Sequence, residues 1–271
     1  MSSLKVLVLC GRSPRHLYVA NRLCQAADVL AIVHESGQRV DFERVRKLLL
    51  RPRTLIRKAW RWLRDRRRYA GNPEERYFFA DAPARLDRPE LVRNVPDVND
   101  SSLVDLCDEL QPDVIMVFGT SLIRGPLLKK GRLGIVNLHG GLSPEYRGAD
   151  CTFWALYNGE VDKVGCTIHY INSGIDTGHL IAHICPTVNS CDDELTLFWR
   201  AIRESAEVYA ELIKRLEKRH RLGKAQEDKG QLYQVKDRSY RHERQLARAI
   251  SDGLLSNVLL PLRVRWFADD E

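Results

Sequence analysis

Four short apolar runs set the strongest limit on how this chain of 271 residues can fold. Each run is nearly continuous and ends at a glycine or a polar residue. Such runs are typical of strands buried on both faces of a parallel sheet. They occupy residues 4–10, 29–33, 113–118 and 133–138, with helical patterns at 17–27 and 103–110. The alternation of strand and helix predicts an α/β fold with a doubly wound, mostly parallel sheet.

The last of these runs brings two polar side chains to one point of the sheet. Asn137 and His139 are two residues apart at its end, and two glycines and a proline follow within five residues. Side chains two apart on a strand point to the same face, so Asn137 and His139 should project together into a tight loop. This pair is the first candidate for a chemical site.

A second polar loop lies downstream. The pattern predicts a helix at 151–157, an alternating strand at 164–171 and a polar, glycine-bounded loop at 172–178 that contains Asp176. The ends of these elements fit neighbouring positions in one sheet, which makes Asp176 the third candidate. Each of the three residues, taken alone, also has an ordinary explanation in a turn or a cap.

The chain is expected to form one catalytic domain with two additions. Residues 1–220 form the domain, which ends with a long amphipathic helix. A basic helical insertion at 44–75 interrupts it, and residues 221–271 form a C-terminal extension.

The net charge of +7 is concentrated in one segment. Residues 44–68 contain twelve Lys or Arg and one acid, so this segment carries +11 and the remainder of the chain −4. Pro52 divides it into two helical pieces. Their apolar positions are Val45, Leu48, Leu49, Leu55, Ile56, Trp60, Trp62 and Leu63. Two interpretations stay open: the insertion packs its Trp and Leu face on the main domain, or it contacts a nucleotide diphosphate, a lipid-linked substrate at a membrane surface, or nucleic acid.

The turn after the first strand is a candidate anion site. Residues 11–16 join that strand to a helix, at an edge where open α/β sheets bind anionic ligands. No Gly-x-Gly-x-x-Gly fingerprint occurs in the sequence, so a dinucleotide is not expected. Arg12 and Ser13 of this turn, together with Arg147, are the candidate substrate-binding residues.

Two motifs resemble those of the formyltransferases that use 10-formyltetrahydrofolate, a family that includes glycinamide ribonucleotide, methionyl-tRNA and nucleotide-sugar formyltransferases. The first is Asn-Leu-His-Gly-Gly-Leu-Ser-Pro-Glu-Tyr-Arg-Gly at 137–148, and the second is Gly-Ile-Asp-Thr-Gly at 174–178. The resemblance covers roughly residues 1–215. It departs from the family pattern at Gly141, Ser143 and His179, where Ser, Leu and Pro are usual.

The resemblance implies a Rossmann-like formyltransferase core and a role for each candidate. Asn137 would donate a hydrogen bond to the formyl oxygen, and His139 would act as a general base or stabilise that oxygen when protonated. Asp176 would orient and tune His139 and help relay a proton to the departing folate nitrogen. The expected cofactor is 10-formyltetrahydrofolate, as the formyl donor. It would contact Phe118, Gly119, Thr120, Ser121, Leu122, Ile123, Ile171 and Gly174.

The expected acceptor is a primary amine on a small molecule. We favour an amino sugar on a nucleotide carrier, because the first turn and the basic segment fit a diphosphate. A hydroxylated ornithine destined for a siderophore is the alternative, and it requires little positive charge. Initiator tRNA is not expected, because the fifty or so residues after the long helix leave no comfortable room for a C-terminal barrel. The chain begins at its first strand, which disfavours a formyltetrahydrofolate hydrolase with a preceding regulatory domain.

A non-enzymatic alternative is a degenerate transferase that binds anionic ligands through residues 44–68. The presence of Asn137, His139 and Asp176 argues against it, because a binding module needs none of them.

Composition sets the remaining expectations. No apolar run approaches the roughly 18 residues needed to cross a bilayer, so we expect a cytoplasmic protein. Its seven cysteines lie in apolar contexts without a Cys-x-x-Cys pair, which favours buried thiols over disulfides or metal ligands. No metal is expected. Membrane surface contact through 44–68 and a homo-oligomer both stay open.

Overall fold

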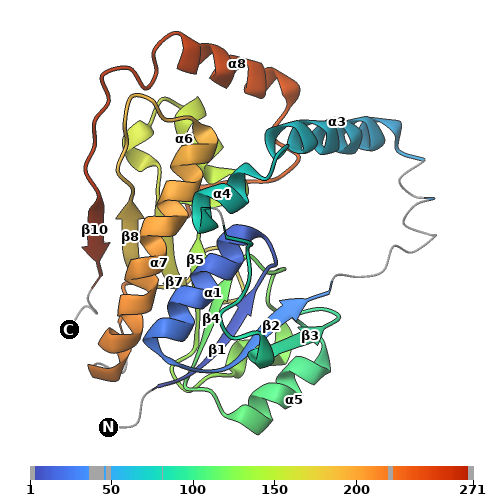
Figure 1. Ribbon diagram of the computed structural model, residues 1–271, viewed down its shortest axis with the longest axis vertical. Coiled ribbons are helices and arrows are strands. Elements are labelled where there is room, and N and C mark those ends of the chain that lie inside the picture. The colour runs from blue at the N-terminus through green and yellow to red at the C-terminus, as the bar shows by residue number, and fades with distance from the viewer. Residues whose placement is uncertain (1–3, 37–45, 47–49, 81, 219–221, 268–271) are drawn as a thin grey trace.

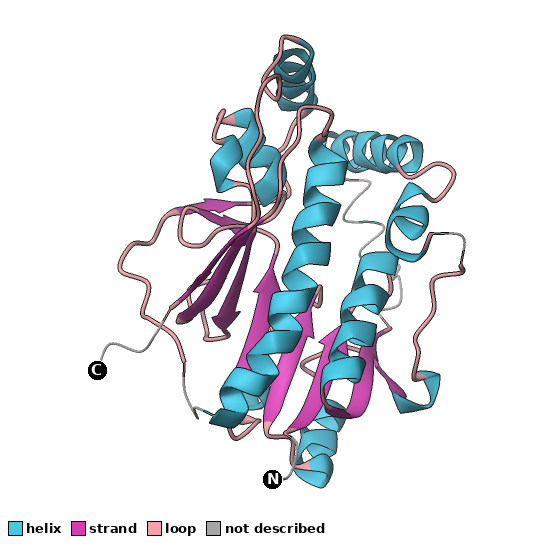
Figure 2. Cartoon of the chain, turned by 60° about the vertical axis from the view of Figure 1, so that its left-hand side comes forward, coloured by secondary structure: helices cyan, strands magenta, loops and turns pink. Residues whose placement is uncertain are grey.

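An eight-stranded mixed sheet forms the centre of the computed structural model, which describes residues 4–36, 46, 50–80, 82–218 and 222–267. The strands lie in the order β10-β8-β7-β5-β4-β1-β2-β3. Figure 2 shows the sheet behind the helices that cover one of its faces. Strands β1 to β5 run parallel, whereas β7, β8 and β10 are antiparallel to their neighbours. Their bounds are β1 (Lys5–Cys10), β2 (Asp28–Glu35), β3 (Val92–Val95), β4 (Val114–Phe118), β5 (Ile135–His139), β7 (Cys166–Tyr170), β8 (Leu180–Cys185) and β10 (Arg263–Trp266). The predicted α/β class is confirmed.

Helices cover both faces of this sheet. Figure 1 shows α1 and α7 side by side on one face, and α5 packs on the other face. The helices are α1 (Pro14–Ala26), α3 (Pro52–Arg68), α4 (Pro73–Phe79), α5 (Ser101–Leu110), α6 (Cys151–Tyr157), α7 (Glu194–Lys218) and α8 (Tyr240–Ser251). Alternate residues of β1 enter the two cores: Val6 and Val8 pack with α1 and α7, and Leu7 and Leu9 pack with α5. This is why the first apolar run has almost no polar residue.

The segment after residue 221 adds a strand to each of two sheets. Strand β9 (Gln231–Tyr233) pairs in parallel with β6 (Tyr146–Gly148) in a small second sheet, and β10 extends the main sheet beside β8. Between them, α8 contributes Leu246 to an apolar cluster with α6. Figure 1 shows α8 at one end of the molecule, from which the chain returns along the edge of the sheet to β10.

The sequence patterns did not predict β3, β10 or α4. Strands β3 and β10 lie at the two edges of the main sheet, where most of their residues are partly or fully exposed. Edge strands therefore lack the continuous apolar signal of β1 and β4. Most of the first helical piece expected between residue 44 and Pro52 lies outside the described residues, at 44, 45 and 47–49.

Candidate active site

The three predicted catalytic residues come together at the carboxyl end of β5. His139 Nδ1 lies 3.5 Å from Asp176 Oδ2. Asp176 has a left-handed backbone, with φ of 50°, and its Oδ2 accepts a hydrogen bond of 2.9 Å from the Gly148 N–H. The side-chain amide of Gln226 donates to the Asp176 carbonyl at 3.0 Å. The loop that carries Asp176 is therefore held from both sides.

His169, which we did not predict as a site residue, joins Asn137 to this group. It lies directly opposite Asn137 in the antiparallel pair β5–β7. Its Nδ1 donates to the Tyr170 carbonyl at 2.7 Å, because a carbonyl only accepts. His169 Nε2 also lies 3.5 Å from Asp176 Oδ1, and a protonated ring would donate there. In the neutral ring Nε2 instead accepts a hydrogen bond from Asn137 Nδ2 at 3.2 Å. This contact fixes the Asn137 carboxamide with its donor group toward His169 and leaves the second N–H of Nδ2 available.

The hydrogen bonds of His139 determine where its proton lies. His139 Nε2 donates to the Tyr146 carbonyl at 3.1 Å. In a neutral ring Nδ1 then has no hydrogen, and it faces the Asp176 carboxylate. The ring is thus arranged to take up a proton at Nδ1, and the carboxylate would stabilise the imidazolium that forms.

Burial and charge act in opposite directions on this pair. Burial lowers the pKa of His139, and Asp176 only partly offsets that effect. Burial by itself would raise the pKa of Asp176, but His139, His169 and the Gly148 N–H outweigh it and hold the pKa at about 2. At neutral pH the site therefore holds an ionised carboxylate beside a neutral imidazole, which is the state required of a general base.

The depressed pKa of Asp176 makes stability depend on pH. Its folded-state pKa of about 2 lies below the ordinary 3.8, so the carboxylate should contribute about 2 kcal/mol above pH 4. This contribution should fall by about half at pH 3, because protonation then competes with folding. Asp176→Asn, which tolerates a left-handed backbone, should remove this part of the pH dependence. Urea unfolding of wild type and variant at pH 6 and pH 3 measures it. The control is Asp228→Asn, the same change at an exposed aspartate. If the free energy of unfolding falls equally between pH 6 and pH 3 in all three proteins, the prediction is contradicted.

Two cavities meet at this group. The larger cavity, of about 640 Å³, is lined by the β4 exit loop, by the loop of Asp176 and by β9 with its exit. The smaller cavity, of about 280 Å³, lies between α1, α3, α6 and α7. The residues common to both are Phe118, Gly119, His139, Gly140 and Gly148. His139 is therefore accessible from two separate spaces.

Gly119 shapes the wall between the cavities. Its φ is +74°, and a Cβ there would lie 2.1 Å from Nε2 of His16 in α1. A side chain at this position is excluded both by the backbone conformation and by the buried His16 ring, which packs edge-on against Phe118. The close approach of α1 to the β4 exit loop thus requires glycine.

The smaller cavity contains buried polar atoms without a protein partner. Asp150 and Thr152 line this cavity. Asp150 Oδ2 and Thr152 Oγ1 are buried, and neither has a hydrogen-bond partner among the described residues. Unpaired buried oxygens of this kind are costly unless something else bonds to them. They are candidates for contacts with a polar ligand.

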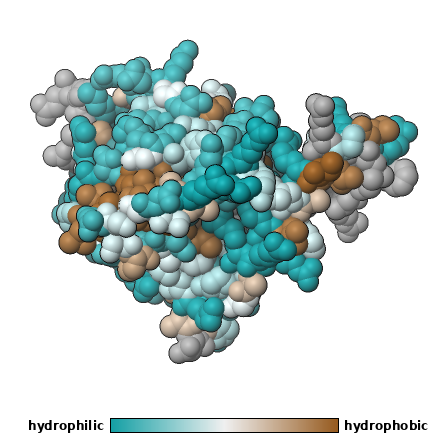
Figure 3. Space-filling view, turned by 90° about the horizontal axis from the view of Figure 1, so that it is seen from above, coloured by the Kyte–Doolittle hydropathy of each residue, from teal (hydrophilic) through white to brown (hydrophobic). Residues whose placement is uncertain are grey.

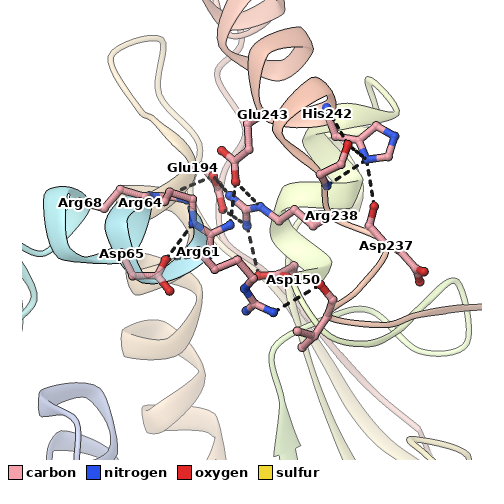
Figure 4. A network of polar contacts seen from close by, with 12 residues as sticks. Arg61, Arg64, Asp65, Arg68, Asp150, Glu194, Asp237, Arg238, His242 and Glu243 are labelled. Atoms are coloured by element: carbon pink, nitrogen blue, oxygen red, sulfur yellow. Dashed lines mark hydrogen bonds and ion pairs between the residues drawn. The ribbon is translucent and has the colours of Figure 1, made fainter. Parts of the chain in front are cut away.

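A network of charges forms the outer wall of the smaller cavity (Figure 4). Arg238 is 3% exposed and lies within 3.1 Å of carboxylate oxygens of Glu194, Glu243 and Asp150. Its guanidinium also stacks on Phe153, 3.8 Å from the ring centroid. From α3, Arg64 pairs with Glu243 at 2.7 Å and Arg68 with Glu194 at 2.8 Å. The basic insertion is therefore bound to α7 and α8 through shared carboxylates.

The three candidate substrate-binding residues lie outside both cavity linings. Arg12 donates to Asn94 Oδ1 at 2.6 Å, and the Ser13 N–H donates to His16 Nδ1 at 3.2 Å. Arg147 donates to the Ile175 carbonyl at 3.2 Å, next to Asp176. From the first turn it is Arg15 and His16, not Arg12 and Ser13, that line the smaller cavity.

The departure from the family pattern at Gly141 has a steric explanation. A Cβ at Gly141 would lie 2.5 Å from Cys151 Cβ and 2.6 Å from the Tyr146 carbonyl oxygen. Cys151 itself approaches His139, with its Sγ 3.6 Å from Nε2, and burial raises the thiol pKa so that the group is neutral. The close approach of Cys151 thus leaves no room for a side chain at position 141.

Two further observations concern metal ions and disulfides. Among the described residues, no cluster of three or more His, Cys, Asp or Glu side chains is placed to hold a metal ion. All seven cysteines are free thiols, and four of them are buried.

Comparison with known sequences shows what this fold and site belong to. The fold is that of an α/β protein in which Asn137, His139 and Asp176 lie together at the carboxyl end of β5. The sequence model of the formyl transferase family matches residues 71–213. The chain belongs to this formyl transferase family, and the resemblance seen in the sequence is confirmed.

Individual relatives match only part of this chain. Methionyl-tRNA formyltransferase of Chlorobium chlorochromatii (strain CaD3) is 31% identical over 137 residues, which are 51% of this chain and 43% of that protein. The chain spans less than half the length of this relative and of two similar ones.

Solved structures resemble the chain over nearly its whole length. A sugar N-formyltransferase from Shewanella sp FDAARGOS_354 has a TM-score of 0.59 at 16% identity, covering 99% of each chain. A 4-N formyltransferase from Francisella tularensis has a TM-score of 0.55 at 15% identity, covering 97% of this chain and 98% of that one. At these identities the likeness is one of fold.

Proposed function

We propose that this protein is an N-formyltransferase that moves a formyl group from 10-formyltetrahydrofolate to a primary amine, with an amino sugar on a nucleotide carrier as the acceptor. The observation that carries the proposal is the position of His139, where the two cavities meet. A transfer between two sizeable molecules needs two binding spaces that share one acid–base group.

The larger cavity fits the donor. All eight residues that the family resemblance implies for folate line it, from Phe118 to Ile123 and at Ile171 and Gly174. Its volume of about 640 Å³ is in the usual range of small-molecule sites. Phe118, Ile123 and Ile171 offer apolar contact to a flat ring, and the exposed backbone of the β4 exit loop offers polar contact. When bound, the donor supplies the formyl group.

The catalytic residues have complementary parts in the transfer. A carbon–nitrogen bond to the amine forms, the bond from the formyl carbon to the folate nitrogen breaks, and one proton passes from amine to folate. The free N–H of Asn137 would stabilise the formyl oxygen as negative charge develops. Nδ1 of His139 would accept the amine proton, and Asp176 would hold the resulting imidazolium until the proton is delivered to the leaving nitrogen.

The smaller cavity fits an acceptor rich in polar groups. The Asp150 and Thr152 oxygens described above suit sugar hydroxyls or the amine itself. Arg15 and Arg68 line the same cavity, and each is also paired with a glutamate of the chain. The fold likeness to the Shewanella sugar N-formyltransferase supports the same acceptor class. Seven free thiols fit a reducing compartment, so we place the reaction in the cytoplasm.

The direct test is incubation of the protein with 10-formyltetrahydrofolate and a panel of amines. A nucleotide-linked amino sugar should be formylated, with release of tetrahydrofolate. Methionyl-tRNA belongs in the panel because it is the substrate named for the curated relatives, and hydroxyornithine because it needs little positive charge. Deformylation without any acceptor would identify a hydrolase instead, and no reaction with any amine would favour a binding module.

A substitution at Thr152 tests the assignment of the smaller cavity. Thr152→Val keeps the shape but removes an oxygen that has no partner among the described residues, so the melting temperature should not fall. Loss of one hydrogen bond to the acceptor should raise its KM about fivefold and leave the KM of the folate donor unchanged. Thr120→Val, the same change in the larger cavity, is the control. A shift in the donor KM with Thr152→Val would contradict the assignment.

A further inference from the structure

Helix α3 turns its apolar face to solvent. Ile56 is 69% exposed, Trp62 61%, Leu63 43% and Leu55 37%. The other three side chains follow Leu55 by one, seven and eight positions. At helical spacing all four therefore lie in a single stripe along one side of the helix. Figure 1 shows α3 extending outward from the body, and Figure 3 shows hydrophobic residues at that end of the molecule.

The opposite face of α3, which is rich in arginine, packs on the protein. Besides the pairs of Arg64 and Arg68 described above, Arg61 donates to the Val235 carbonyl at 3.3 Å. Trp60 packs edge-on against Tyr240, with 6.2 Å between ring centroids. The interpretation in which the Trp and Leu face packs on the main domain is therefore wrong, except at Trp60. The reason is that carboxylates of α7 and α8 bind the arginines, which fixes the rotation of the helix.

We propose that this outer face of α3 binds an anionic membrane surface. Its apolar stripe is bordered by exposed cations: Arg51, Lys58, Arg66 and Arg67. The guanidinium of Arg66 lies over the Trp62 ring, 5.2 Å from its centroid, within the stripe itself. Tryptophan and aliphatic side chains between basic ones are the composition of helices that lie in the membrane interface, with their cations at the lipid phosphates.

The charge of α3 decides between a membrane and a second copy of this chain. The helix carries eight basic residues and one acid, Asp65, and that acid is paired with Arg64 at 2.7 Å. Two such faces brought together would place like charges side by side, which opposes self-association. An anionic bilayer satisfies both the apolar stripe and the charge. None of the described helices is long and apolar enough to cross a membrane, so the contact is a surface one.

This contact would place the smaller cavity near the lipid. Arg64 and Arg68 on the inner face of α3 line that cavity, while the outer face lies on the bilayer. The proposal is independent of the reaction, since binding to a membrane is measured without any substrate.

Vesicle sedimentation of the full chain tests the proposal. The protein should bind vesicles that contain phosphatidylglycerol and not vesicles of phosphatidylcholine alone, and half-molar salt should weaken binding. The double variant Ile56→Ser/Trp62→Ser should bind at least tenfold more weakly, because it removes apolar surface that enters the interface. Leu259→Ser/Leu262→Ser, at exposed leucines of 77% and 44%, is the matched control and should bind like wild type. Circular dichroism should show both variants folded, since all four side chains are exposed.

Three results would overturn the proposal. The first is that the protein does not bind phosphatidylglycerol vesicles. The second is that the two double variants lose vesicle binding to the same extent. The third is self-association, seen by sedimentation velocity without lipid, that Ile56→Ser/Trp62→Ser abolishes, because it would assign the face to a second copy of the chain.

Discussion

Replacing His139 by Ala is expected to lower kcat by about 10²- to 10⁴-fold, the usual contribution of a positioned general base. The His139 imidazole offers a hydrogen-free nitrogen where the two cavities meet, next to an ionised carboxylate. Binding of folate should change little, because most of the larger cavity is formed by other residues. Single-turnover kinetics with 10-formyltetrahydrofolate and the best amine of the panel measure the loss.

A second variant and a control separate chemistry from folding. His139→Gln keeps a donor for the Tyr146 carbonyl but has no basic nitrogen, so it should be as inactive as His139→Ala while melting near the wild-type temperature. His179→Ala, at an exposed histidine that lines neither cavity, should retain full activity. Turnover by His139→Gln within tenfold of wild type would contradict the assigned base.

The pH profile gives an independent check of the same residue. Burial holds the pKa of His139 below its ordinary 6.5, so the acid limb of kcat/KM in the wild-type enzyme should lie below pH 6.5. Above that limb the imidazole is neutral and competent to accept a proton.

Replacing Arg238 by Met is expected to lower the free energy of unfolding by about 3–5 kcal/mol, the usual loss when one partner of a buried ionic network is removed. Arg238 is 3% exposed and forms ion pairs with Glu194, Glu243 and Asp150 together. Without it, Glu243 keeps its pair with Arg64 and Glu194 its pair with Arg68, but Asp150 loses the ion pair it has among the described residues. For a chain of this size the melting temperature should fall by about 10 °C.

Two further variants define what Arg238 contributes. Arg238→Lys keeps the charge but not the forked donor geometry, so it should lose less than half as much stability. Arg88→Ala removes an ion pair with Glu90 in which both side chains are more than half exposed, and it should leave the melting temperature close to that of the wild type. Differential scanning calorimetry compares the three. If Arg238→Met costs no more than Arg88→Ala, the network does not stabilise the fold.

Local pattern was sufficient to locate the central strands. The runs that became β1, β4 and β5 are buried on both faces, and such burial leaves a continuous apolar signature in the chain. Strands β3 and β10 lie at the edges, where burial imposes no such signature, so they could not be recognised. The same reasoning identified Asn137 and His139, because side-chain alternation on a strand is a local property.

His169 shows where such reasoning ends. Its role depends on lying opposite Asn137, and that register is set by antiparallel pairing of strands about thirty residues apart. The alternating pattern at 164–171 places His169 on one face of β7 but does not specify the partner strand. The available signal was that His169 is a polar residue on a predicted strand that could lie next to β5.

By itself, the sequence determined the α/β class, the family and the three residues of the candidate site, because these follow from strand burial, side-chain alternation and motif spacing along a few neighbouring residues. The tertiary structure alone decided which residues surround that site and which way α3 faces. Arg238, Glu194 and Asp150 meet only because the chain after α7 returns across the molecule. The ion pairs of Arg64 with Glu243 and of Arg68 with Glu194, not the amphipathic pattern of α3, set the rotation of that helix. Contacts between residues so far apart in the chain leave no periodic trace in the sequence.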